Sequence, residues 1–192
     1  MAAKVTKSSD HAENAEMAKI AKYLLPGMSL DKMLDKDALD ELRNDWKRAH
    51  VVNTDALFDS ILKNFLTMYF YKDQDKVVEK LFDPNIGGPL VSLTHKARLA
   101  YALGLIGETT LNEYEGIHKI RNEFAHSRDA SFADPKVIRH IQKLSSAKGH
   151  KVTAKNSYGF YEEAIHVCLD GLAEALRQLH KHFDAKKLFY KK

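Results

Sequence analysis

The feature that most constrains the fold is a long apolar stripe near the C-terminus. Between about residues 160 and 183, apolar side chains recur at steps of three and four residues, which places them on one side of an α-helix. The stripe consists of Tyr161, Ile165, Cys168, Leu172, Ala175, Leu176, Leu179 and Phe183. Because this apolar side must be covered by other elements, we expect the helix to be the spine of a helical bundle.

The rest of the chain repeats the helical pattern. No segment alternates apolar and polar residues with a period of two, so strands are not predicted. A second stripe contains Phe58, Ile61, Leu62, Phe65, Leu66 and Tyr69. The remaining helices are predicted at about 74–82, 92–107, 110–126 and 135–144. The sequence therefore predicts an all-α protein with a single helical bundle.

Local signals indicate where these helices begin and end. Asn53 or Thr54 is expected to open the second stripe, Ser92 or Thr94 the helix after it, and Thr109 or Thr110 the next. The pair Asp134-Pro135 combines an acidic cap with a first-turn proline. Loops are predicted at 83–89, which holds two prolines and two glycines, at 127–134 and at 145–157.

The first fifty residues have fewer apolar side chains than the rest. We expect little fixed structure over residues 1–10, a short helix over 11–25 that ends at Pro26-Gly27, and a polar helix from Ser29 to about His50. The predicted organisation is an N-terminal tail and helical extension over 1–50, followed by a helical bundle domain over 51–192.

Composition narrows the function classes. The chain is 44% hydrophobic and 29% charged, with a formal net charge of +4, which is too mildly basic to be typical of a nucleic-acid-binding domain. No apolar run is long enough to cross a bilayer and no secretory signal is apparent, so we expect a cytoplasmic protein without membrane contact. The single cysteine, Cys168, has apolar neighbours and is predicted to be a buried hydrophobe.

No known cofactor or metal pattern is present. The histidines, acids and Cys168 do not show a zinc spacing, Asp73, Asp75 and Asp83 lack the spacing of a calcium loop, and Gly87-Gly88 is not followed by the residues of a phosphate-binding loop. We therefore expect no metal and no cofactor.

The densest group of functional side chains is the hexapeptide Arg121–His126. On an ideal helix Arg121 lies about 40° from Ile117, inside the apolar stripe, whereas His126 lies about 180° from Ile117. In a catalytic interpretation, Arg121 holds a phosphate, His126 transfers a proton and Asn122 orients the histidine or the substrate. Those three groups suffice for metal-independent RNA cleavage, although convergence needs His126 beyond the helix end or a second subunit.

A structural interpretation of the same residues remains open. A buried guanidinium must find a carboxylate or a carbonyl, because an unpaired buried charge is costly. Arg121 and Glu123 would then form ion pairs with neighbouring helices. His126 would favour the C-terminal end of its helix, where positive charge is stabilised.

Several segments together are similar to the mannitol operon repressor family of bacterial proteins. They are Lys96–Ile106, Tyr114 and Ile120–His126, with Thr54–Phe58 before them and Ser131–Pro135 after them. The resemblance covers about residues 50–145. It implies an all-helical regulator of transcription that lacks an evident DNA-binding motif and acts through protein partners, either the transcriptional machinery or a cognate regulator.

The motif of Arg, Asn, three residues and His also resembles that of the HEPN superfamily of helical ribonucleases, toxins and inactive scaffolds. Arg121, Asn122 and His126 match position by position. This resemblance implies a HEPN-like bundle and a homodimer in which two motifs meet. The first hypothesis is a dimeric regulator without catalytic turnover, and the alternative is a HEPN-type endoribonuclease or toxin that binds RNA.

Overall fold

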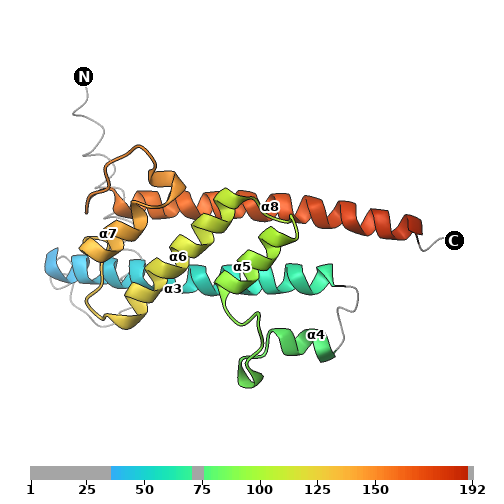
Figure 1. The fold of residues 1–192 in the computed structure, drawn as a ribbon. Helices are drawn as coiled ribbons and strands as arrows, with labels where there is room; N and C mark the ends of the chain where they lie inside the picture. The colour runs from blue at the N-terminus through green and yellow to red at the C-terminus, as the bar shows by residue number, and fades with distance from the viewer. Residues whose placement is uncertain (1–35, 71–75, 190–192) are drawn as a thin grey trace. The chain divides into compact units, whose positions relative to one another are not determined.

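The computed structural model describes the backbone of residues 36–70 and 76–189, and side chains within those ranges up to residue 180 (Figure 1). These residues form six α-helices and two short 3-10 helices, and no strand occurs among them. The predicted all-α class is confirmed. The helix expected over 11–25 and the cap expected at Ser29 lie outside the described residues.

The elements follow one another with short connections. The α-helices are α3 (Lys36–Tyr69), α4 (Lys76–Leu81), α5 (Leu93–Ala102), α6 (Glu108–His126), α7 (Pro135–Ile141) and α8 (Ser157–Phe189). The 3-10 helices are η1 (Pro84–Ile86) and η2 (Ser145–Ala147), which lie in segments predicted as loops. The chain divides into two compact units, Met1–Arg48 and Ala49–Lys192.

Helix α3 is continuous where a boundary was expected. Asn53 and Thr54 do not open a new helix but lie inside α3, so the predicted break near residue 50 is wrong. No proline or glycine occurs between Lys36 and Tyr69, and residues with good capping ability are tolerated inside a helix when packing favours it. Thr54 is buried in α3 rather than free to cap it.

The core of the second unit surrounds α6. Figure 1 shows α6 between α5 and α7, and α6 contacts α5, α7 and α8. Its buried residues include Tyr114, whose ring packs edge-on against Phe58 of α3 with the centroids 5.2 Å apart. The side of α8 that completes this core contains Tyr161, Ala164, Cys168, Leu172, Ala175 and Leu179, all buried.

The Phe183 side chain of the predicted α8 stripe lies outside the described residues, and among the described members the burial expected for Leu176 is wrong. Leu176 is 54% exposed, whereas its neighbour Ala175 is buried. Successive residues on a helix differ by about 100°, so only one member of this adjacent pair can face the core centre. The predicted burial of Cys168 is confirmed, since its side chain is fully buried.

The predicted helix starts are only partly correct. Ser92 caps α5 by accepting from the His95 N–H, and Asp134 caps α7 by accepting from the Lys136 N–H, with Pro135 in the first turn. Helix α6, however, begins after Gly107 without a side-chain cap. Thr110 is instead buried against α8, where a Cβ at Gly171 would overlap its side chain.

Two helix ends also differ from expectation. Helix α5 ends at Ala102 rather than near Gly107, and Gly104 adopts a positive φ of 71°, a conformation that glycine accommodates without strain. Helix α7 ends at Ile141, three residues before the expected Leu144. None of the described helices combines the length and the apolarity needed to cross a bilayer.

Candidate functional site at the contact of α3 with α6

Arg121 lies at the edge of the buried side of α6. Its side chain is 36% exposed, and its Nε is 3.9 Å from Oδ2 of Asp55 on α3. Its Nη1 donates a hydrogen bond of 3.2 Å to the side-chain oxygen of Asn122. The guanidinium is therefore compensated by a carboxylate of a neighbouring helix, as the structural interpretation of the sequence expected.

Asp55 also holds a second side chain of α6. Its Oδ1 is 3.0 Å from Nδ1 of His118, and the Asp55 side chain is only 12% exposed. When Nδ1 carries the proton and donates to Asp55, the other ring nitrogen, Nε2, is left as the basic atom. No hydrogen bond to this Nε2 is found among the described residues. We call Asp55, His118, Arg121 and Asn122 the Asp55 cluster.

This geometry defines what the Asp55 cluster can do. A carboxylate that orients a histidine is the arrangement that prepares an imidazole for proton transfer, and a partly exposed arginine beside it can bind an anion. The same contacts also tie α6 to α3 through charge-assisted hydrogen bonds. The cluster can therefore serve either as a proton-transfer site or as a lock between two helices.

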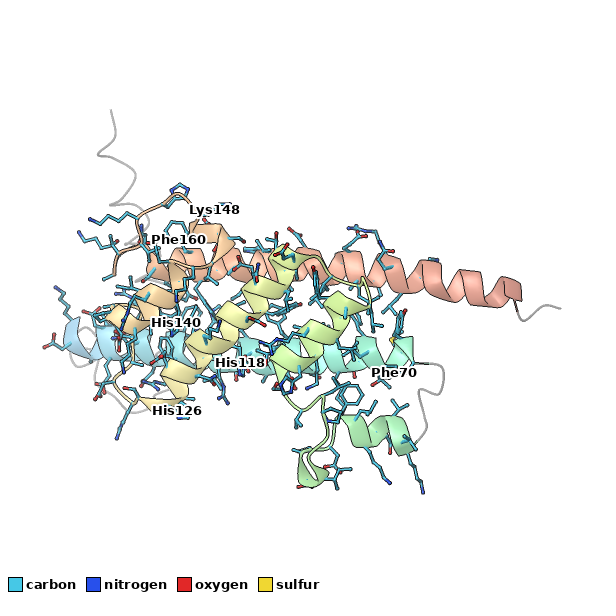
Figure 2. The ribbon with its side chains drawn as sticks, viewed as in Figure 1. Phe70, His118, His126, His140, Lys148 and Phe160 are labelled. Carbon is cyan, nitrogen blue, oxygen red and sulfur yellow. The ribbon has the colours of Figure 1, made fainter. Side chains whose placement is uncertain are left out.

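His126 is not part of this cluster. It is the last residue of α6 and is exposed, and no hydrogen bond or ion pair of His126 is found in the described part of the chain. Figure 2 shows His118 and His126 separated along α6. Of the three predicted site residues, the structure thus joins Arg121 to Asn122 and leaves His126 apart within one chain.

A comparison with protein families identifies the relationship of most of the chain. The model of the family described as "Mannitol repressor" matches residues 35–177, which is well over half of the sequence. The chain belongs to the mannitol repressor family. No curated protein and no solved structure gives a match.

The match extends further than the resemblance seen in the sequence. That resemblance covered about residues 50–145, whereas the mannitol repressor match includes the start of α3 and most of α8. All four members of the Asp55 cluster, together with His126, lie inside the matched range. The cluster is therefore part of the mannitol repressor domain rather than of an appended segment.

The sequence offered only part of the signal for this cluster. His118 lies three residues before Arg121, so the two share one side of α6, and this spacing is the part of the cluster that the sequence shows. Asp55 lies in the Thr54–Phe58 motif, which contributed to the family resemblance without a role for the carboxylate. The contact between Asp55 and α6 joins residues 63 positions apart, which no local pattern reveals.

Other ionisable groups of this mannitol repressor domain serve its packing. The Glu123 side chain pairs with His140 of α7, whose Nε2 is 3.2 Å from Glu123 Oε1. Burial raises the pKa of the Cys168 thiol well above its ordinary value, which keeps it protonated and poorly nucleophilic. Among the described residues, no group of three or more His, Cys, Asp or Glu side chains is placed to hold a metal ion.

Proposed function

We propose that this protein is a regulator of transcription that represses a mannitol operon through contacts with other proteins, without catalytic turnover. The observation that carries this proposal is the match to the mannitol repressor family over residues 35–177. The proposed partner is the transcriptional machinery or a cognate regulator, the proposed state is a homodimer, and the proposed compartment is the cytoplasm.

Exposed apolar side chains support a mechanism based on protein contacts. Leu57 and Met68 on α3 are 56% and 45% exposed, and Leu169 and Leu176 on α8 are 44% and 54% exposed. The two α8 leucines are seven residues apart and therefore share one side of the helix. Large apolar groups of this kind are typical of protein interfaces, whereas DNA contacts rely mainly on basic and polar side chains.

The helix pair α5–α6 argues against direct DNA reading. It has the sequential arrangement of a helix-turn-helix unit, in which the second helix would enter the major groove. The residues of α6 outside the core are of mixed charge and are not predominantly basic, as a recognition helix would be: they comprise the acids Glu108, Glu115 and Glu123 and the bases Lys119 and Arg121. Carboxylates on the would-be recognition helix oppose the negative backbone of DNA.

The regulatory role is tested by removing the gene from its own organism. We expect transcripts of the mannitol uptake and oxidation genes to rise several-fold during growth without mannitol, and to return when the wild-type gene is restored. Unchanged transcripts would contradict a repressor. The purified protein, titrated against the operon's regulatory DNA, should bind it no more tightly than a scrambled duplex, and specific binding would contradict action through protein partners.

A metal-independent endoribonuclease is the second candidate, because Arg121 is hydrogen-bonded to Asn122 and partly exposed, and His126 is exposed at the end of the same helix. The HEPN-like reaction would use Arg121, Asn122 and His126, with the second motif supplied by a partner subunit. Labelled RNA incubated in EDTA with wild-type protein and with the His126→Ala variant tests this candidate. Cleavage that the variant lacks would favour the enzyme over the regulator.

A further inference from the structure

A polar pocket lies on the side of α6 that faces away from Asp55. It has a volume of about 420 Å3 and is bounded by α6 and by the segment from His140 to Lys148. Its lining includes Thr109, Asn112 and Lys119 of α6, and Lys143, Leu144 and Lys148 of the opposite wall. Figure 2 labels His140 and Lys148, which mark the two ends of this second wall. We call it the lysine pocket.

The walls of the lysine pocket are fixed by buried contacts. Leu144 is buried against Gly116, where a Cβ would overlap the leucine side chain, so glycine allows the two walls to meet closely. The fully buried carboxylate of Glu113 accepts hydrogen bonds from both the backbone N–H and the hydroxyl of Ser145. The pocket is therefore preformed rather than assembled by flexible loops.

Side-chain hydrogen bonds also fix the loop that follows Lys148. The Gln142 side chain donates to the His150 carbonyl at 2.9 Å and accepts from the Val152 N–H at 3.0 Å. This carboxamide uses one donor and one acceptor within the protein, so it is held in place at the rim of the pocket.

The lysine ammonium groups of the pocket, in contrast, have no ion-pair partner within the described part of the chain. Lys119, Lys143 and Lys148 come from three different turns of the chain. Backbone N–H groups of the last two donate to carbonyls within the same wall, but none of the three ammonium groups forms a hydrogen bond or ion pair with another described residue. Glu115, which also lines the pocket, is already bound to Arg98 with its Oε1 2.8 Å from the Arg98 Nε. His140 is engaged with Glu123. Three lysines whose ammonium groups have no partner among the described residues therefore line one concave polar surface.

We propose that the lysine pocket binds a small phosphomonoester that also carries hydroxyl groups. Ammonium groups are strong binders of phosphate as point charges, and three of them match a dianion. Thr109 and Asn112 also line the pocket, and their side chains form no hydrogen bond with other described residues, which leaves a hydroxyl and a carboxamide for ligand hydroxyls. The volume lies within the range of about 300–1,000 Å3 that small-molecule sites occupy.

The concave shape favours a small molecule over a nucleic-acid backbone. Binding of a duplex or a single strand relies on a basic surface that follows successive phosphates. Here the three lysines surround a single hollow, and the acidic Glu115 and Glu108 lie on the same helix, α6. The ligand class rests on the proposed function in one respect only, namely that a phosphorylated hexitol is the effector we expect for a regulator of mannitol genes.

Calorimetric titration of the purified full chain tests the proposal. The probes are mannitol 1-phosphate, mannitol, inorganic phosphate and a short DNA duplex. We expect mannitol 1-phosphate to bind at least tenfold more tightly than inorganic phosphate, and mannitol to show no heat of binding. Equal affinity for inorganic phosphate, tighter binding of the duplex, or no binding of mannitol 1-phosphate up to millimolar concentration would each overturn the proposal.

Matched variants locate the site. Lys119→Gln, Lys143→Gln and Lys148→Gln should each weaken the binding of mannitol 1-phosphate by about tenfold, since each removes a hydrogen bond to a charged group. Lys136→Gln is the control, because Lys136 is an exposed lysine of α7 outside the pocket. Equal losses in the control, or unchanged affinity in all three pocket variants, would overturn the site.

These measurements separate this proposal from the regulatory one. All four lysines are exposed, so circular dichroism should show that the variants fold like the wild type. Binding by purified protein does not depend on transcription. Tight, lysine-dependent binding together with unchanged transcripts in the deletion strain would retain the pocket and remove the repressor function.

Discussion

At the scale of single residues, the most informative contact is the one between Asp55 and two side chains of α6. An arginine at the edge of a core and a histidine beside it both depend on one nearly buried carboxylate. Removing such a shared acceptor leaves two donors without their partner, which usually costs more than the net strength of the hydrogen bonds themselves. The contribution of the Asp55 cluster to the free energy of unfolding should therefore be measurable, whether or not the cluster has a catalytic role.

Asp55→Asn is expected to lower the free energy of unfolding by about 1–3 kcal/mol, because the neutral amide is a weaker acceptor for His118 and Arg121. Urea unfolding followed by circular dichroism at neutral pH measures this change. His126→Ala is the matched control and should stay within about 0.5 kcal/mol of the wild type, since His126 is exposed. Comparable losses in both variants would contradict the assignment of Asp55 as the shared partner.

The sequence predicted that Arg121 needs a partner, but not which residue provides it. The helical position of Arg121 required a carboxylate or a groove, and the structure supplies the carboxylate. The identity of that carboxylate could not be inferred, because Asp55 lies on another helix and nothing local distinguishes it from Asp59. Asp59 in fact binds the buried Lys96, with the Lys96 Nζ 2.5 Å from its Oδ1.

At the scale of elements, local signals predicted helix identity better than helix ends. Ser92 and the Asp134-Pro135 pair acted as expected because a cap satisfies backbone groups within its own turn. The continuity of α3 and the uncapped start of α6 depended on tertiary packing instead. Thr110 is the clearest case, since its burial against Gly171 of α8 competes with a capping role.

Gly171→Ala is expected to destabilise the protein by about 1–3 kcal/mol, because the added methyl group would overlap Thr110 at the contact of α6 with α8. Gly159→Ala, in the same helix, should instead be neutral or stabilising by up to about 1 kcal/mol, since a Cβ there meets no neighbouring atom. Thermal and urea unfolding of both variants measure the difference. Two changes of the same sign would contradict a close approach of the helices at Gly171.

At the scale of the whole molecule, one core combines three weakly acidic side chains from two helices. Tyr114 of α6 and Tyr161 and Cys168 of α8 are buried, and burial raises the pKa of each above its ordinary value. The Tyr114 hydroxyl also donates to the Cys168 carbonyl at 3.4 Å. In the unfolded chain the same groups would titrate near their ordinary values, so the stability of the fold is coupled to alkaline pH.

The sign of this coupling follows from proton binding. Above the ordinary pKa values, about 8.5 for cysteine and 10 for tyrosine, the unfolded chain releases protons that the folded chain retains. The free energy of unfolding must therefore fall as pH rises, by about 1.4 kcal/mol per pH unit for each such group. Urea unfolding between pH 8 and pH 11 should show a decline that steepens above pH 10.

Tyr161→Phe separates this effect from general alkaline denaturation. The variant keeps the buried ring and removes one titrating hydroxyl. Above pH 10 its free energy of unfolding should therefore decline less steeply than that of the wild type, and the two slopes should differ by about 1.4 kcal/mol per pH unit. Tyr101→Phe is the control, because that ring is 44% exposed, and it should keep the wild-type slope. A wild-type slope in Tyr161→Phe would mean that the buried phenol does not couple to folding, and that net charge alone drives the loss of stability.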